Sequence, residues 1–358
     1  MEQKKITLSI LDIEKKYTVD TSEATYGVDQ IVQWGPNNDA PLLYKNCYRS
    51  SATLKACVDA SVNYLLGDGV EVNAKAWDKE VNRRGMSMRQ FVAHLGASLQ
   101  IYGGFAFQVI YNQLGLPVEL FPLEFANIRT NESGTKIWYA KKWTKWSQKA
   151  DVFDAYNPEK IDKDNPTQIF YYKGDFTTNV YPLPPYFGAI PDVLTEIECA
   201  KYSLNSVTNG FSARYILNFP ESNNLTDEQK EGIESAIKTK FCGSEPEANF
   251  LMYWSEDGTK KIEVSKIEGD EGPERYIAIK DNARQNIFVS MRLTPNLLGL
   301  PTQTTGFNSQ EYSDAMKLYE KTVIDPLRDT IVSVVSKVTG VENAISFVPF
   351  SITFNNGE

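Results

Sequence analysis

The residue types that most often carry catalysis are few and scattered in this chain. His94 is the single histidine, in the apolar-periodic segment MRQFVAHLGASL, and a Ser-His-Asp triad or a multi-histidine metal site would have to use it. We expect a partly buried structural histidine there. Cys47, Cys57, Cys199 and Cys242 lie far apart, without a C-x-x-C pair or a nearby histidine, and the spacing of zinc ligands is therefore absent.

The acidic residues offer no better reaction centre. The segment EGDEGPE at 268–274 has carboxylates for a weak cation site but lacks the spacing of an EF-hand, which favours a solvated turn. Glu196 and Glu198 are two apart on a predicted helix and point to different faces, which makes a poor acid/base pair. We therefore expect a protein that is not an enzyme and carries no cofactor or metal. A hydrolase that uses Asp or Glu alone stays open as an alternative.

An uncharged loop, Leu300 to Gln310, lies between two predicted helices and is rich in threonine, glutamine and asparagine. A phosphate cradle, a flexible hinge and the lining of a pore are three interpretations. A Walker A loop needs G-x-x-x-x-G-K-[ST], because the lysine neutralises phosphate charge. Here Gly299 and Gly306 are seven apart, Phe307 follows, and no lysine is present, which excludes the phosphate cradle.

Composition restricts the class of protein. The chain has 358 residues, 42% apolar and 23% charged, as expected of a water-soluble globular protein with two or three domains or one elongated subunit. A net charge of -9 argues against a clamp on a nucleic-acid backbone, although a polyanion can still slide past such a surface. Low cysteine content and the start MEQKKITLSILDIEKKY predict a reducing cytosol, and no apolar run approaches the roughly 18 residues of a membrane span.

The N-terminal half predicts mixed structure. Residues 1–40 are expected to be extended or irregular, followed by a helix over 41–66 that GDG at 67–69 stops, and a helix over 88–102 capped by Ser87. Residues 105–123 predict a hairpin, and KIWYAKKWTKW and IFYYKGDF predict strands. An aromatic-basic cluster there either stacks on bases or belongs to a half-solvated sheet, which we favour: Trp138, Trp143, Trp146, Lys141, Lys142 and Lys145.

The C-terminal half predicts long helices. Pro191 opens the first, whose apolar residues recur at steps of 4, 3, 4, 3 and 4, along about 28 Å of helix: Val193, Ile197, Ala200, Leu204, Val207 and Phe211. This stripe lies on a core or packs against neighbouring copies. A capping box, Thr226 with Gln229, starts a short helix, and ANFLMYW with KKIEVSKIE predicts a second hairpin.

Two further helices flank the uncharged loop. The first runs over about 274–293, with an apolar side that includes Ile277, Ile287, Phe288 and Met291. The second, capped by Asn308 or Ser309, runs to Gly340 as a C′ residue, and we expect a kink just N-terminal to Pro326.

The order of these segments resembles the portal proteins of tailed double-stranded DNA bacteriophages, the HK97-like and SPP1-like portal superfamily. The resemblance covers roughly residues 85–340. It rests on PPYFGAIP opening a helix, then LTDEQ, then ARQNIFVSMRLTPNLLG, a polar loop, and a long helix that contains DPL. Each motif alone is weak, and their order and spacing carry the match.

The resemblance implies an α+β subunit with named parts. These are an N-terminal region and wing (1–185), a first stem helix (186–217), a clip (218–273), a second stem helix (274–296), a tunnel loop (297–308), a long kinked wing helix (309–340), and a C-terminal segment with little or no crown (341–358).

The resemblance also implies a function. A portal is a ring, usually a dodecamer, at one capsid vertex of the virion, through which DNA is packaged and ejected. Its implied partners are double-stranded DNA, the major capsid protein, the terminase large subunit and the head-tail adaptor, with assembly in the host cytoplasm and no membrane. A non-viral oligomeric scaffold or adaptor is the alternative.

Site residues follow from the resemblance by position. The six residues of the apolar stripe would pack between stem helices. Possible basic residues of the channel, or else ordinary surface charges, are Lys238, Lys240, Arg284 and Arg292. The tunnel loop would present uncharged side chains to sliding DNA: Pro301, Thr302, Gln303, Thr304, Thr305, Gly306, Phe307 and Asn308.

Overall fold

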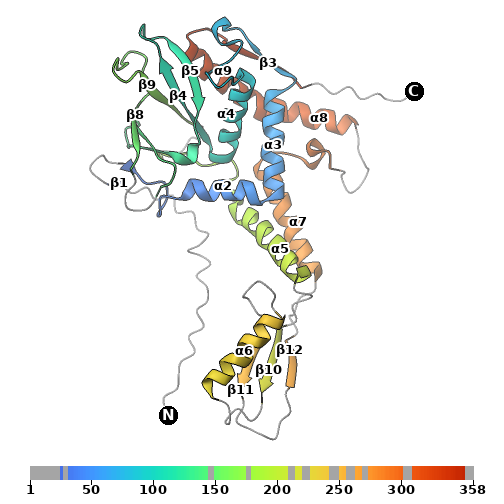
Figure 1. Ribbon diagram of the computed structural model, residues 1–358. Coiled ribbons are helices and arrows are strands. Elements are labelled where there is room, and N and C mark those ends of the chain that lie inside the picture. Colours follow the sequence, from blue (N-terminus) through green and yellow to red (C-terminus); the bar gives the residue numbers. More distant parts are fainter. Residues whose placement is uncertain are drawn as a thin grey trace. The chain divides into compact units, whose positions relative to one another are not determined.

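The computed structural model describes residues 25–26, 31–143, 149–174, 179–208, 214–219, 226–241, 250–254, 263–267, 273–300 and 309–350. It confirms the α+β class, with helices and sheets in one chain (Figure 1). The chain divides into two compact units, of which unit 1 comprises residues 1–194 and 284–358 and unit 2 comprises residues 195–283.

Unit 1 is built on a six-stranded sheet with the order β5-β4-β9-β8-β7-β6. Neighbouring strands are antiparallel except β8 and β9, which are parallel. The strands are β4 (Gly104–Tyr111), β5 (Pro117–Pro122), β6 (Ile128–Thr130), β7 (Lys136–Tyr139), β8 (Asp151–Ala155) and β9 (Thr167–Lys173). The β4–β5 pair confirms the first predicted hairpin, whereas β6 and β8 were not anticipated from the sequence.

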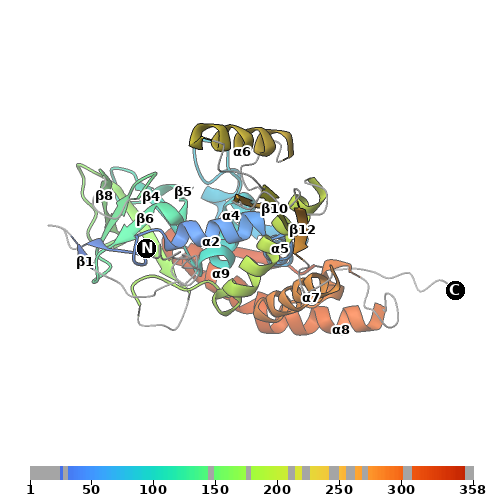
Figure 2. The same ribbon diagram turned by 90° about the horizontal axis from the view of Figure 1, so that it is seen from below.

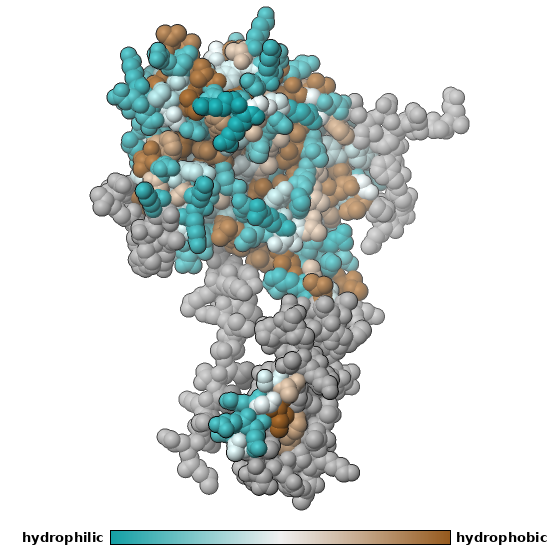
Figure 3. Space-filling model, viewed as in Figure 1, coloured by the Kyte–Doolittle hydropathy of each residue, from teal (hydrophilic) through white to brown (hydrophobic). Residues whose placement is uncertain are grey.

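One face of this sheet packs on helices and forms the core. Alternate residues of β4 point to the same side, so Phe105, Phe107 and Val109 all lie in one buried cluster. Helix α4 (Met88–Tyr102) supplies Phe91 and Leu95 to that cluster. A capping box of Ser87 and Gln90 starts α4, as the sequence predicted. Over the outer surface of unit 1, hydrophilic and hydrophobic side chains are interspersed (Figure 3).

The helix predicted over residues 41–66 is two helices. They are α2 (Ala40–Ser50) and α3 (Ala52–Leu66), and α2 contacts α4 (Figure 2). Ser51 separates them because its backbone is extended and its hydroxyl accepts the N–H of Leu54, so that it caps α3. A serine inside an apolar-periodic segment can restart a helix, and periodicity alone does not show this.

Short elements complete unit 1. They are β1 (Thr25–Tyr26), β2 (Ile31–Val32), β3 (Gly69–Val72), β13 (Ile345–Val348) and the 3-10 turns η1 (Lys75–Trp77), η2 (Phe125–Asn127), η3 (Phe187–Ala189) and η5 (Pro295–Leu298). Strand β3 pairs with β13, and this pairing joins residues 345–348 to the segment that follows α3.

The aromatic-basic cluster is largely part of the packed sheet. Trp138 is buried, and the Trp143 indole donates to the Asn127 carbonyl at 2.8 Å and stacks on the buried Arg129 guanidinium. Lys141 and Lys142 are exposed. Lys145 and Trp146 lie outside the described residues. The half-solvated sheet is therefore the correct interpretation for the described members.

Unit 2 contains a three-stranded sheet and one helix of its own. The strands β10 (Arg214–Phe219), β11 (Phe250–Trp254) and β12 (Glu263–Ile267) have the order β11-β10-β12. The second predicted hairpin is therefore wrong, because β10 lies between the two strands that were expected to pair. Helix α6 (Asp227–Phe241) connects the parallel strands β10 and β11, and the capping box of Thr226 and Gln229 starts it as predicted.

Two helices continue from one unit into the other, and a third long helical segment follows. They are α5 (Ile190–Thr208) and α7 (Pro273–Ser290), then α8 (Ser309–Tyr319), the π-helical turn η6 (Glu320–Ile324) and α9 (Asp325–Thr339). Gly340 ends α9 with a positive φ of 70°, as predicted for a C′ residue.

Candidate functional site

Helices α5 and α7 lie side by side, and the burial of their apolar side chains differs along their length. Asn286 of α7 donates to the Asp192 carboxylate of α5 at 2.8 Å. Near this bond the apolar side chains are buried in the single chain: Val193, Ile197, Ala283, Ile287 and Phe288. The structure thus confirms burial for Ile287, Phe288 and Met291 among the four residues expected on the apolar side of α7.

Further along the pair, large apolar side chains are exposed. Leu204 of α5 is 63% exposed and Ile277 of α7 is 60% exposed, so the expectation that Ile277 lies on a packed face is wrong within one chain. Tyr202 and Tyr276 stack on each other, with ring centroids 4.5 Å apart, and both are partly exposed. Exposed apolar residues gathered on one helix pair are typical of a surface that another protein covers.

Helix α7 ends in a Schellman motif, and the 3-10 turn η5 follows before the uncharged loop. The Leu293 N–H donates to the Phe288 carbonyl, and the Arg292 N–H donates to the Val289 carbonyl. Arg292 therefore takes the left-handed position, with φ of 54°, where glycine is the usual residue. Its side chain is exposed at the point where the chain leaves the helix.

The long helix after the loop is irregular just N-terminal to Pro326, where the sequence predicted a kink. Its π-helical turn, η6, ends two residues before Pro326, and the Asp325 N–H donates to the Glu320 carbonyl, five residues back. Proline has no N–H to offer the preceding turn and its ring crowds that turn, so a widened turn there is a low-cost solution.

Arg328 ties this widened turn to helix α3. Its guanidinium donates to the Leu65 carbonyl at 3.0 Å and the Tyr64 carbonyl at 2.8 Å, and it pairs with the Glu320 carboxylate at 2.8 Å. The last carbonyls of a helix have no partner within the helix and carry partial negative charge. A single buried arginine thus caps α3 and fixes the first residue of η6.

A second arginine completes the cap. Arg89 of α4 donates to the Leu66 carbonyl at 3.4 Å and to the Gly67 carbonyl at 3.3 Å. The C-terminus of α3 is therefore held from two sides, by helices that are far apart in the sequence.

Tyrosine hydroxyls make further links between α3 and the segments around the loop. Tyr64 donates to the Leu297 carbonyl at 2.9 Å and shares a hydrogen bond with Tyr312 at 3.0 Å. Ser61 and Tyr319 share a bond of 2.6 Å. Burial raises the pKa of Tyr64, and burial also raises the pKa of Tyr319, to about 12. Both segments that border residues 301–308 are thus anchored on α3.

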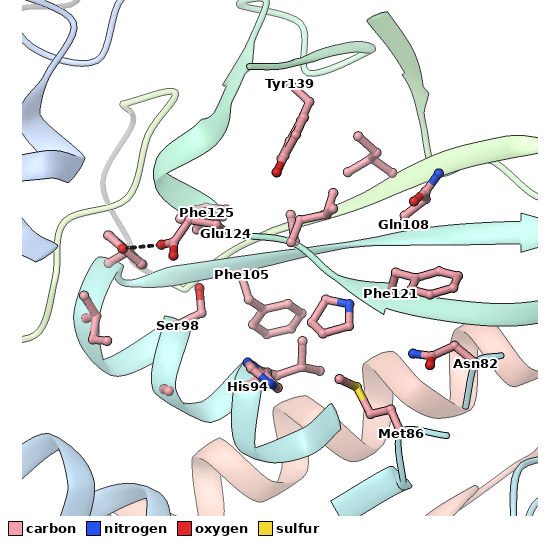
Figure 4. A pocket seen from close by; sticks show the side chains of 18 of the residues that line it. Asn82, Met86, His94, Ser98, Phe105, Gln108, Phe121, Glu124, Phe125 and Tyr139 are labelled. Carbon is pink, nitrogen blue, oxygen red and sulfur yellow. Dashed lines mark hydrogen bonds between the residues drawn. The ribbon is translucent and has the colours of Figure 1, made fainter. Parts of the chain in front are cut away.

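Unit 1 also holds an open pocket of about 920 Å³ between the helices α2 and α4 and the sheet. His94 lines it together with Ser98, on the helical side, and Gln108 and Phe121 face them from β4 and β5 (Figure 4). The expectation of a partly buried His94 is wrong, because its side chain is on the side of α4 that faces away from the core cluster and is exposed.

The predicted site residues are only partly within the described structure. Pro301–Asn308 and Phe211 lie outside it, as do the side chains of Val207, Lys238 and Lys240. Arg284 is half-buried on α7, Ala200 and Leu204 are exposed on α5, and Val193 and Ile197 are buried. Over the described ranges, no three His, Cys, Asp or Glu side chains are grouped to hold a metal ion, and no helix is long and apolar enough to cross a membrane.

Comparison with known families decides the relationship of this chain. The family model described as "Phage portal protein" matches residues 71–348, which is most of the chain. The chain belongs to the phage portal protein family. The family is structural, and the match does not favour the alternative of a non-viral scaffold.

Solved structures show that the portal fold extends over nearly all of this chain. The match to a chain in the virion of a native gene transfer agent particle covers 90% of this chain and 86% of the matched chain, with 16% identity and a TM-score of 0.56. The match to a chain in the neck of the native particle, computed with C12 symmetry, covers 89% of this chain and 85% of the matched chain, with 16% identity and a TM-score of 0.54. No curated protein matches.

A portal of the HK97 family gives a third comparison. The crystal structure of an HK97 family phage portal protein from Corynebacterium diphtheriae covers 85% of this chain and 94% of that chain, with 11% identity and a TM-score of 0.52. At such low identity these likenesses establish the shared fold, and the roles of individual residues have to be argued from this chain.

Sequence reasoning missed the two arginine caps and the tyrosine pair. Arg89 and Arg328 meet the same helix end from positions more than two hundred residues apart, which no local pattern indicates. Tyr202 and Tyr276 carried a weak signal, since each is a large aromatic residue on a predicted helix next to the apolar stripe.

Proposed function

We propose that this portal protein assembles into a closed ring at one vertex of a phage-like capsid and that DNA is packaged and ejected through its central channel. The family match over residues 71–348 supports the portal role, and similarity to a neck chain in a C12 reconstruction supports a ring. In this role the protein positions and guides DNA and catalyses no reaction. It resides in the virion, after assembly in the host cytoplasm.

The observation that carries the ring is the exposed apolar surface of α5 and α7. Leu204 and Ile277 each leave more than half of the side chain in water. Burying such a side chain against a neighbour contributes about 2 kcal/mol, and the gain repeats at every interface of a ring. We assign α5 and α7 to the stem, with Ala200, Leu204, Tyr202 and Ile277 in contacts between subunits.

The other parts take their roles from the order of elements. Residues 1–185 and the long helix over 309–340 form the wing, which meets the major capsid protein. Residues 218–273 form the clip, which binds the terminase large subunit during packaging and the head-tail adaptor afterwards.

DNA passage depends on weak contact with the channel wall. The chain's net charge of -9 disfavours tight binding, because a protein holds DNA mainly through lysine and arginine contacts that release counterions. Residues 301–308 carry no charge and offer hydroxyl and amide groups, which form exchangeable hydrogen bonds to phosphates. Arg284 and Arg292, with Lys238 and Lys240, supply scattered positive charge along the path.

Substitution of the loop tests the channel role. Thr304→Asp places a carboxylate where phosphates pass, and we expect DNA packaging to fall while the ring still assembles. Thr304→Asn is the matched control, because asparagine has nearly the shape of aspartate and no charge. This variant should package DNA normally. Packaged DNA per particle measures the first effect and particle mass the second. If Thr304→Asp prevents ring assembly instead, the loop is a structural part of the subunit and the assignment is wrong.

A further inference from the structure

The open pocket of unit 1 has the size of a ligand-binding site. Its volume of about 920 Å³ lies at the upper end of the range of pockets that bind small molecules or short peptide segments. Five segments build it: helix α2, the turn over residues 82–86, helix α4, the hairpin β4–β5 with the residues that follow it, and strands β7 to β9. All of its described lining residues belong to unit 1.

The charge of the pocket is opposite to that of the whole chain. Lys45, Arg49, Arg83 and Arg84 line it, against the carboxylates of Glu124 and Asp151, although the chain carries a net charge of -9. Two of these cations have partners, since Lys45 pairs with Glu124 at 2.8 Å and Arg83 pairs with Glu119.

The other two cations are available to a ligand. Within the described part of the chain, neither Arg49 nor Arg84 forms a salt bridge, although Arg49 is near enough to Glu124 to influence it electrostatically. The Arg84 guanidinium lies over the Phe121 ring, 5.4 Å from its centroid. That stacking orients the guanidinium, which reduces the entropy lost when it binds a carboxylate in a bidentate way.

Apolar groups also line the pocket. Phe121, Phe153 and Ile110 line the pocket and are each only half-buried. Met86, from the turn over residues 82–86, also lines it (Figure 4). Half-exposed rings beside free guanidinium groups suit a ligand that is anionic at one point and apolar at the next.

We propose that this pocket is a docking site for a segment of another protein that carries one or two carboxylates next to a bulky apolar side chain. Arg49 and Arg84 bind the carboxylates, and Phe121 and Phe153 pack on the apolar side chain. A nucleic acid fits less well, because the fixed carboxylates of Glu124 and Asp151 would repel a continuous phosphate backbone. A short acidic peptide can place its charges on the two arginines and avoid them.

The docking site is separate from the proposed stem, since no described residue of α5 or α7 lines it. It offers a second surface by which this portal protein recruits a partner. The binding test of this pocket requires only the folded chain and no ring. A failure of this proposal can therefore be distinguished from a failure of ring assembly.

Selection from a displayed library of random dodecapeptides on the immobilised full-length chain tests the proposal. We expect enriched peptides with Asp or Glu beside Phe, Tyr, Trp or Leu. The double variant Arg49→Glu/Arg84→Glu should weaken their binding by about tenfold or more, because it removes both charge-assisted contacts and puts like charges in their place. Lys160→Glu/Lys163→Glu is the matched control. It reverses two exposed charges of the same unit outside the pocket, and it should leave affinity nearly unchanged.

Several results would overturn the proposal. They are the absence of any enrichment, enrichment of basic or uncharged peptides, and equal losses in the two double variants. Tighter binding of a single-stranded oligothymidylate than of any selected peptide, abolished by Arg49→Glu/Arg84→Glu, would assign the pocket to nucleic acid instead. Selected peptides that match this chain's own sequence would make the occupant a second copy. Thermal unfolding of each variant verifies that the fold is retained.

Discussion

Buried tyrosines connect distant parts of unit 1. The Tyr186 hydroxyl donates to the Ile101 carbonyl at 2.9 Å, and the Tyr181 hydroxyl bonds to the Val32 carbonyl at 2.5 Å. Burial raises the pKa of Tyr44, Tyr102 and Tyr186 above the ordinary value of 10. A hydroxyl that is both buried and hydrogen-bonded stabilises the fold only while it holds its proton.

Alkaline pH should therefore destabilise this protein through these tyrosines. A group whose pKa is raised in the folded state contributes stability that is complete below the unfolded pKa and is lost as the pH rises through the folded pKa. For Tyr319 this window runs from pH 10 to about pH 12. Arg129 acts in the opposite direction, because burial lowers its pKa to about 10. Above that pH the buried guanidinium loses its charge, and the free-energy cost of burying that charge is lost with it.

Tyr319→Phe isolates one of these groups. We expect stability near neutral pH to change little, because the Ser61 hydroxyl keeps its own bond to the Cys57 carbonyl. Between pH 10 and about pH 12 the free energy of unfolding should fall less steeply than in the wild-type chain, by the contribution of about one proton. Urea unfolding across this range measures the slope. An identical slope in both proteins would show that Tyr319 does not titrate as the structure requires.

Residue-level expectations succeeded where the signal is local. The caps at Ser87, Thr226 and Gly340 were predictable because each satisfies orphan backbone groups within a few residues of itself. His94 was predicted wrongly because apolar periodicity does not show which positions of a helix will line an open pocket. Arg328 was missed because its partners lie on another helix.

At the scale of elements, helices were more predictable than sheet pairing. The periodic segments over 88–102, 190–208 and 309–339 are helical, with an interruption next to Pro326. The hairpin expected between β11 and β12 failed because adjacent strands in the sequence need not pair. Helix α6 carries the chain back so that β11 runs parallel to β10, and β12 takes the other edge of β10.

The exposed face of α5 and α7 yields a prediction for assembly. Leu204→Asp/Ile277→Asp should lower the average mass of the assembled protein, because two desolvated carboxylates at each interface oppose association. Leu114→Asp is the control, since Leu114 is 83% exposed on the hairpin of unit 1, and it should leave the mass unchanged. Analytical ultracentrifugation compares the three proteins. If the double variant still forms full-sized assemblies, α5 and α7 are not part of the interface between subunits.

At the scale of the whole molecule, the order of segments was the strongest signal in the sequence. No single motif identified a portal, yet the succession of a mixed α/β region, two long helices around a small α/β unit, an uncharged loop and a kinked helix matches the family over residues 71–348. The order of segments does not predict the open pocket of unit 1, because its described lining residues come from segments that are separate in the sequence.

The mass and symmetry of the purified chain test the central claim most directly. Mass measurement with electron microscopy, over about a hundredfold range of concentration, reports the assembly state because association depends on protomer concentration. The account predicts closed rings of one size with a rotational symmetry axis and an open centre. A chain that stays monomeric at every concentration, or that forms open filaments in place of rings, would contradict it.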